Sequence, residues 1–257
     1  MKNISLLALS LGVLSVANAA TFTLTDGNSV VNGDDAIGLY DWFTDGTDHL
    51  YNQDYFWRVG NTAEQRQGAI GPGVITQFAP NIANVKFTAA GLFSIDITYT
   101  LIGGANGSGT SDIGEVVRIR NLTNQALDFH LFEYDDFDIL GTAGGDTAFF
   151  DGNIVTQFEM PVVSMVGTVP TANRWQIGPF PGLLNDLNDG VATNLTNGVT
   201  PSGPGDMTFA FQWDRTIAAN GNFIMSKNKR IETVPEPATM AALGLGLAAL
   251  ARRRRSK

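Results

Sequence analysis

Apolar and polar residues alternate one by one along much of the chain between residues 20 and 233. The clearest run is Leu92 to Ile102, in which apolar side chains occupy every second position from Phe93 to Leu101. The segment Met207 to Asp214 follows the same pattern. A period of two predicts strands with one buried and one hydrated face. Further strands are expected at Thr21 to Thr25, Tyr51 to Gly60, Ile82 to Thr88, Glu115 to Asn121, Leu127 to Tyr134, Ile154 to Val163, Arg174 to Ile177 and Phe223 to Ile231.

Segments rich in glycine and proline separate these strands, as at residues 68–73, 101–109, 140–145 and 200–205. Such segments mark turns. Only Gly182 to Asp189 has a helical pattern. Many short strands without alternating helices predict an all-β fold, an antiparallel β-sandwich of the jelly-roll type. Residues 20–233 are numerous enough for a single domain with its own core.

The first 19 residues have the composition of a signal peptide. Lys2 precedes an uncharged apolar run from Ile4 to Val16, and Ala17-Asn18-Ala19 follows with the small-x-small pattern that signal peptidase recognises. The apolar run is shorter than the roughly 20 residues that a spanning helix needs. We therefore expect signal peptidase to remove this helix by cleavage after Ala19.

The last residues, 234–257, combine a proline motif, an apolar segment and a cluster of arginines. Val234 to Pro237 cannot begin inside a helix, because proline lacks a backbone donor. The uncharged segment Ala238 to Ala251 predicts a short C-terminal transmembrane helix. Arg252 to Arg255 should stay on the cytoplasmic side. These features predict an intermediate in the inner membrane whose body lies outside.

This tail resembles the PEP-CTERM sorting signal of exported proteins in Gram-negative bacteria. The resemblance implies recognition by an exosortase, a membrane-embedded enzyme similar to a cysteine transpeptidase. It also implies that Pro235, Glu236 and Pro237 are the sorting motif, and that Arg252, Arg253, Arg254 and Arg255 are the stop-transfer block. A plain tail anchor is the alternative, although it would not need the prolines. The stretch EVVRIRNLTNQALDFHLFEYDDFDI is similar to PEP-CTERM proteins whose β-rich body has no assigned activity.

Cysteine content and charge restrict the chemistry of the body. The chain has no cysteine, which excludes disulfides and cysteine-based nucleophiles or metal sites. Its net charge is −9, and the ends carry Lys2, Arg252 to Arg255 and Lys257 against the single acid Glu236, so the body is more acidic than the whole. Such a surface repels nucleic acid and anionic lipid. It suits either a soluble secreted protein or one that binds cations.

Four acidic residues within FEYDDFD are candidate metal ligands: Glu133, Asp135, Asp136 and Asp138. Carboxylates are the hard oxygen ligands that Ca²⁺ prefers. In a strand, however, the first two side chains point to one face and the last two to the other, so a single ion would require a turn. A hydrated strand end is the alternative.

Aromatic residues crowd between Tyr40 and Trp57, next to several aspartates. The candidate ligand-binding residues are Trp42, Tyr51, Tyr55 and Trp57. Aromatic faces beside carboxylates are typical of carbohydrate sites. The alternative is that this segment forms a core strand of the sandwich.

Catalytic motifs are not evident. His49 and His130 are the two histidines, and no G-x-S-x-G elbow accompanies them. Glu115, Glu133 and Glu159 are the strand-borne acids that a glycosidase could use, and the sequence does not rank them. We expect a protein without catalytic residues or cofactor, exported to the cell surface or extracellular matrix, structural or adhesive and associated with exopolysaccharide. The alternatives are a secreted carbohydrate-active enzyme and an adhesin module stabilised by Ca²⁺.

Overall fold

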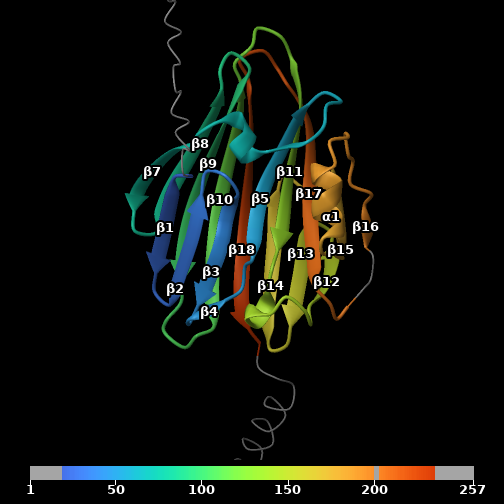
Figure 1. Ribbon diagram of the computed structural model, residues 1–257. Helices are drawn as coiled ribbons and strands as arrows, with labels where there is room; N and C mark the ends of the chain where they lie inside the picture. Colours follow the sequence, from blue (N-terminus) through green and yellow to red (C-terminus); the bar gives the residue numbers. More distant parts are fainter. Residues whose placement is uncertain (1–18, 200–202, 235–257) are drawn as a thin grey trace, which may run out of the picture.

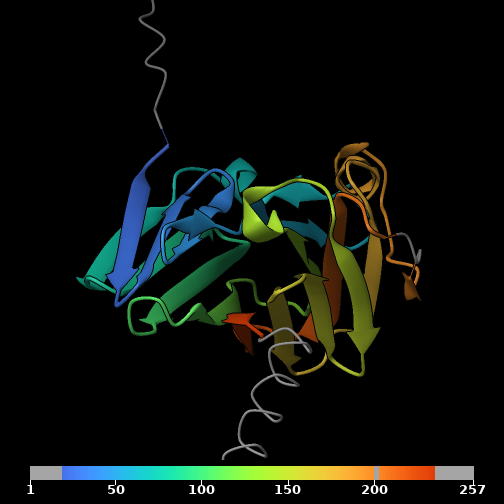
Figure 2. The same cartoon turned by 90° about the horizontal axis from the view of Figure 1, so that it is seen from below.

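The computed structural model describes residues 19–199 and 203–234, which form two β-sheets packed face to face (Figure 1). The strand order in the 10-stranded sheet A is β1-β2-β3-β5-β11-β17-β15-β16, with β4 paired to β3 and β6 to β5. The 8-stranded sheet B has the order β12-β13-β14-β18-β10-β9-β8-β7. Neighbouring strands are antiparallel except for the short pair β15 and β16. This confirms the predicted antiparallel sandwich, and Figure 2 shows its two layers from one end.

The bounds of the elements follow the chain. Sheet A contains β1 (Thr21–Asp26), β2 (Ser29–Asp34), β3 (Gly38–Thr44), β4 (Thr47–Asp48), β5 (Asn52–Val59), β6 (Gln65–Arg66), β11 (Leu127–Asp136), β15 (Arg174–Pro179), β16 (Gly198–Val199) and β17 (Met207–Ile217). Sheet B contains β7 (Val74–Ala79), β8 (Ile82–Ala89), β9 (Phe93–Gly103), β10 (Thr110–Asn121), β12 (Thr147–Asp151), β13 (Ile154–Glu159), β14 (Val162–Val169) and β18 (Asn222–Thr233). The α-helix α1 (Gly182–Asn188) and the 3-10 turns η1 (Gln67–Ile70) and η2 (Ile139–Gly141) complete the described elements.

Alternation along the strands builds the core between the sheets. In β9, Phe93, Ile95, Ile97, Tyr99 and Leu101 are all buried and face the core. The corresponding residues of β17 do the same from sheet A, beginning at Met207 and ending at Trp213. Because every second side chain leaves water, each strand contributes apolar area to one shared core. The opposite faces of the same strands remain available for other contacts.

One predicted strand is in fact a hairpin. The segment Ile154 to Val163 divides into β13, which ends at Glu159, and β14, which begins at Val162. Pro161 lies in the turn between them and has no N–H group with which to continue a ladder. The predicted helix at Gly182 to Asp189 is confirmed as α1.

Strands β2 and β3 were not predicted from the pattern. In β2 the buried positions are Ser29, Val31 and Gly33, of which only Val31 is a large apolar residue. Gly33 is required there, because a Cβ atom would lie 2.6 Å from the Phe22 ring. A strand whose inward positions are small or polar shows no apolar alternation.

The predicted terminal segments lie mostly outside the described residues. These include Ala17, the apolar segment 238–251, the sorting residues 235–237 and the arginines 252–255, whereas Ala19 is exposed just before β1. Within residues 19–199 and 203–234, no helix is both long and apolar enough to span a membrane.

Candidate functional site

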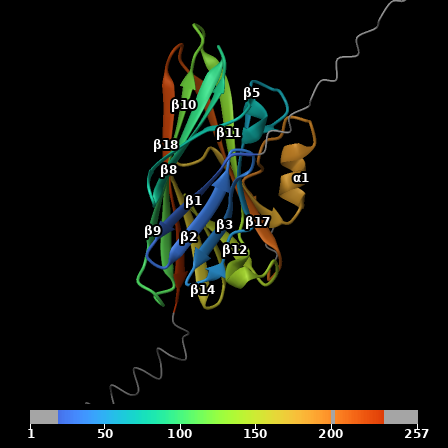
Figure 3. The same ribbon diagram turned by 60° about the vertical axis from the view of Figure 1, so that its left-hand side comes forward.

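The outer face of sheet A, which points away from sheet B, has an apolar centre. Helix α1 packs over β15 and β17 on this face. Figure 3 shows it beside β17. Leu183 and Leu187 lie one helical turn apart, so both point toward the sheet. The buried cluster consists of Phe56, Phe132, Tyr134, Leu183, Leu187, Leu195 and Ala210. Polar residues occupy the two ends of the face on either side of this cluster.

An acidic groove of about 570 Å³ lies at one end, next to the start of β5. Its lining residues are Ile37, Tyr40, Asp41, Asp48, Tyr51, Asn52, Arg66, Asp138, Gly141, Phe180 and Leu184. Tyr51 is 61% exposed and Phe180 is 40% exposed, although both side chains are largely apolar. Arg66 is not a free cation, because its Nε lies 3.3 Å from Oδ2 of the buried Asp54. The groove therefore combines aromatic faces with carboxylates.

A smaller cavity of about 130 Å³ adjoins the groove and shares Tyr51, Asp138 and Phe180 with it. Asp136 and Asp206 also line this cavity. Ligand oxygens of Asp136, Asp138 and Asp206, here called the Asp cluster, all lie within 4.8 Å of one another. Burial is the main reason that the pKa of Asp136 is raised to about 7, and the charges of Asp206 and Asp138 raise it further. The hydrogen bond from Tyr134 acts in the opposite direction and lowers this pKa. Burial also raises the pKa values of Asp138 and Asp206.

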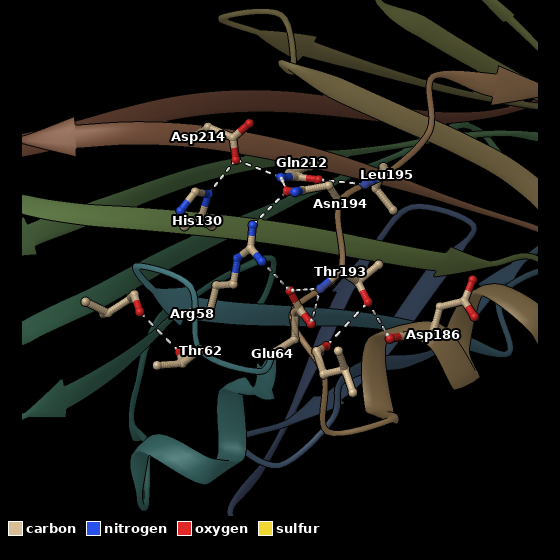
Figure 4. A network of polar contacts seen from close by, with 12 residues as sticks. Arg58, Thr62, Glu64, His130, Asp186, Thr193, Asn194, Leu195, Gln212 and Asp214 are labelled. Carbon is tan, nitrogen blue, oxygen red and sulfur yellow. Dashed lines mark hydrogen bonds and ion pairs between the residues drawn. The ribbon is translucent and has the colours of Figure 1, made fainter.

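A histidine pocket of about 370 Å³ lies at the other end of the same face. Its lining residues are Arg58, Gly60, Asn61, Asp128, His130, Arg174, Asn194 and Asp214. His130 and Asp214 are directly opposite each other on β11 and β17, and His130 Nδ1 lies 2.6 Å from Asp214 Oδ1 (Figure 4). A carboxylate at this distance fixes the orientation of the imidazole ring.

A polar network holds the histidine pocket in place (Figure 4). Arg58 is buried, donates from Nη2 to Asn194 Oδ1 at 2.7 Å and lies 3.2 Å from Glu64 through Nη1. Glu64 in turn accepts from the N–H of Thr193 at 3.0 Å. Gln212 donates to both Asn194 and Asp214, at 2.9 and 2.7 Å. The segment that follows α1 is thereby fixed to β5 and β17, which gives the pocket a preformed wall.

Two of the candidate metal ligands, Glu133 and Asp135, lie on the inner face of β11 instead. Their side chains are buried between the sheets and form ion pairs with Lys227 and Lys229 of β18. The sheet therefore separates them from Asp136 and Asp138, as the period of a strand requires. Glu133 and Asp135 are accounted for by the two lysines and do not contribute to the Asp cluster.

Glu115 joins the same inner cluster from β10. It lies 3.0 Å from Lys227 and 3.3 Å from Lys229, and its Oε2 accepts from the Tyr55 hydroxyl at 2.7 Å. Glu115 and Glu133 are thus fully buried in the core, so neither lines a cleft as a glycosidase would require. Glu159 is half-buried on β13 and accepts from Thr142 at 3.0 Å.

The four candidate aromatic residues divide in a similar way. Trp42 is buried and donates from Nε1 to Ser111 Oγ at 2.9 Å, and Tyr55 is buried against Glu115. Trp57 is half-buried and packs edge-on against Phe93, with ring centroids 4.8 Å apart. These three belong to the core, as the alternative interpretation held. Only Tyr51 lines the groove.

Several residues of these sites could not be found from the sequence. Phe180 precedes α1 in a proline-rich turn, and Asp206 is an isolated acid next to a predicted strand. His130 and Asp214 are 84 residues apart. Only the pairing of β11 with β17 brings the last two residues together. One feature of the sequence did help to locate the site. The alternation along the strand predicts that Asp136 and Asp135 point to opposite faces of the sheet.

Comparison with known proteins identifies the fold and the tail separately. Among solved structures, a bacterial glucoamylase complexed with acarbose matches 90% of this chain with a TM-score of 0.62 and 10% identity, although the match spans 36% of the glucoamylase. A putative aldose 1-epimerase from Escherichia coli K12 matches 84% of this chain over its whole length, with a TM-score of 0.58 and 9% identity. The Slr1438 protein from Synechocystis sp. PCC 6803 matches 88%, also over its whole length, with a TM-score of 0.56 and 11% identity. At such identities the likeness shows a shared β-sandwich fold alone.

The C-terminal residues of the chain contain a motif that is typical of exported proteins. Residues 233–255 match the PEP-CTERM protein-sorting motif. This sorting signal implies an exosortase substrate that is exported to the cell envelope. No protein of curated function matches the chain in sequence.

Proposed function

We propose that this exported protein binds a glycan in the acidic groove and serves as a structural or adhesive component of the cell surface or extracellular matrix. The observation that carries the proposal is the pair of exposed aromatic residues, Tyr51 and Phe180, beside Asp138 in one groove. Sugar rings stack on aromatic faces, and their hydroxyls donate to carboxylates. Two of the structures with this fold, a glucoamylase complexed with acarbose and a putative aldose 1-epimerase, carry names from sugar chemistry.

The charge of the groove favours a neutral glycan. Asp41, Asp48 and Asp138 line it, while its one cation, Arg66, already pairs with Asp54. A polysaccharide rich in uronic acids would bring further negative charge to these carboxylates. Neutral exopolysaccharide is therefore the class of glycan that fits.

The test is calorimetric titration of the purified full chain with neutral and uronate-containing exopolysaccharide fragments. Neutral fragments should bind, and the double variant Tyr51→Ala, Phe180→Ala should lose about tenfold or more in affinity, since each stacking contact is worth about 1 kcal/mol. Phe78→Ala is a matched control, because Phe78 is 67% exposed on β7 in the other sheet. Equal affinities of the double variant and the wild type would refute the groove as the site.

The export route is part of the proposal. Signal peptidase removes residues 1–19, and the apolar segment 238–251 with Arg252 to Arg255 holds the chain in the inner membrane until exosortase cleaves it. Fractionation of cells with an antibody against the arginine tail should detect the tail only in the inner membrane. Full-length protein with this tail in the outer fraction would contradict the route.

A second candidate function is a carbohydrate-active enzyme that uses the histidine pocket. The short contact between His130 and Asp214 favours it, because such a pair supplies a general acid or base. Polarimetry of anomer interconversion in free aldoses, with release of reducing ends from polysaccharide as a second assay, tests this function. An enzyme would lose turnover in His130→Asn and retain it in Tyr51→Ala, which alters the other end of the face. Absence of turnover in the wild type would leave glycan binding as the function.

A further inference from the structure

The Asp cluster is assembled by the pairing of two strands that are distant in sequence. Asp136 is the last residue of β11, and Asp138 follows it in the turn before η2. Asp206 directly precedes β17. Because β11 and β17 are antiparallel and Asp136 pairs with Thr208, the end of one strand and the start of the other meet at the same edge of sheet A. The backbone therefore holds the three carboxylates together.

These carboxylates have no counter-charge in the part of the chain that the structure describes. None of the three forms an ion pair there, although Asp136 is only 2% exposed. The hydroxyl of Tyr134 donates to Asp136 Oδ2 at 3.0 Å, which is one neutral bond. Buried carboxylates are ordinarily paired with cations or bound to metals. The Asp cluster thus lacks the partner that such a group requires.

An independent observation at Asn52 points to the same missing partner. Asn52 lies directly opposite Asp136 in the ladder between β5 and β11, so both side chains stand on the outer face. Its side chain is 8% exposed and lines the groove together with Asp138. Its Oδ1 is buried and accepts no hydrogen bond in the described residues. An orphaned buried acceptor costs free energy unless a donor or a cation satisfies it.

We propose that the Asp cluster, with Oδ1 of Asn52, binds one Ca²⁺ ion where the acidic groove meets the smaller cavity beside it. All four donors are hard oxygen atoms, and Ca²⁺ takes 6–8 such ligands, some of them water. No histidine belongs to the cluster and the chain has no cysteine, so the donor set does not suit zinc or copper. The adjoining cavity of about 130 Å³ has room for water ligands. This site is additional to the proposed glycan function and does not depend on it.

Titration of the purified full chain with CaCl₂, after removal of metal with EDTA and without any glycan, tests the site. Calorimetry should show a single binding event, and Ca²⁺ at about 100 times the Kd should raise the Tm by about 5 °C. Mg²⁺ at the same concentration should raise it less, because it needs a smaller and stricter octahedral site. Absence of both heat and a Tm shift in the wild type would overturn the proposal.

Variants then locate the ion. The double variant Asp138→Asn, Asp206→Asn should lose the Ca²⁺ response, while circular dichroism shows that it is folded. Asn52→Ala should weaken binding by about tenfold, because it removes one neutral ligand. Asp151→Asn serves as a control, since this aspartate is exposed at the end of β12. A Ca²⁺ response unchanged in the double variant would place the ion elsewhere and refute the site, whatever the outcome of the glycan titration.

Discussion

The two faces of strand β11 carry carboxylates in opposite electrostatic settings. On the inner face, Glu133 and Asp135 are fully buried and contact Lys227 and Lys229. On the outer face, Asp136 is almost as deeply buried. In the described structure, however, neither Asp136 nor the adjacent Asp138 and Asp206 form an ion pair with a cation. A buried carboxylate that is paired with a cation has a structural role. A buried carboxylate without a cation indicates instead a site that binds a ligand or holds a proton.

Burial and neighbouring charges also shift the pKa values of the inner cluster, which consists of Glu115, Glu133, Asp135, Lys227 and Lys229. Burial, together with the charge of Glu133, raises the pKa of Asp135 to about 8, although the charges of Lys229 and Lys227 oppose this rise. Burial opposes ionisation of Glu115 too, but the two lysines and the Tyr55 hydroxyl lower its pKa overall. Lys227 and Lys229 thus face the three acidic side chains of Glu115, Glu133 and Asp135. We interpret this cluster as a fixed crosslink between the two sheets.

Removal of a lysine from the inner cluster should have the largest effect on stability. Lys229→Met leaves the buried carboxylates with one of their two cations, so we expect a loss of about 4 kcal/mol in the free energy of unfolding. Chemical denaturation measures the loss. Lys86→Met is the control, because Lys86 is exposed on β8 and should change stability by less than about 0.5 kcal/mol. A loss below about 1 kcal/mol in Lys229→Met would mean that the inner ion pairs are not structural.

A buried carboxylate without a cation should instead make stability depend on pH. Burial raises the pKa of Asp146 to about 7, although Gln157 donates to it at 2.7 Å. The folded state therefore holds this proton more tightly than the unfolded state, and its contribution to stability is lost as pH rises through about 7. Between pH 5 and pH 8 the wild type should lose about 2 kcal/mol relative to Asp146→Asn. Denaturation curves for both proteins across this range measure the difference, and parallel pH profiles would disprove the assignment.

The smallest effect on stability is expected at Tyr51. This side chain is 61% exposed at the groove, so Tyr51→Ala should change the free energy of unfolding by less than about 0.5 kcal/mol while it weakens glycan binding. Trp42→Ala, in the core of the same segment, should cost about 4 kcal/mol. Thermal unfolding of the two variants separates a binding residue from a core residue. Similar losses in both would show that Tyr51 is a packing residue.

The sequence predicted the layers of this fold better than its sites. Alternation alone locates the strands that line the core, such as β9, and it separates Asp135 from Asp136. It cannot supply partners, because Lys227 meets Glu133 across 94 residues and only through the packing of the two sheets. Asp206 likewise reaches Asp136 only through strand pairing. Crowding of aromatic residues, by contrast, was ambiguous from the start, because core strands and sugar sites use the same side chains.

The most direct test of the account compares Glu133→Gln with Asp136→Asn, which neutralise the inner and the outer face of β11. Both free energies of unfolding should be measured at pH 8 in EDTA. We expect Glu133→Gln to destabilise the protein by about 3 kcal/mol, because Lys227 and Lys229 lose a carboxylate. Asp136→Asn should be neutral or stabilising by about 1 kcal/mol, because it relieves repulsion from Asp138 and Asp206. A loss of similar size in both variants would contradict the distinction between a structural inner face and a ligand-binding outer face.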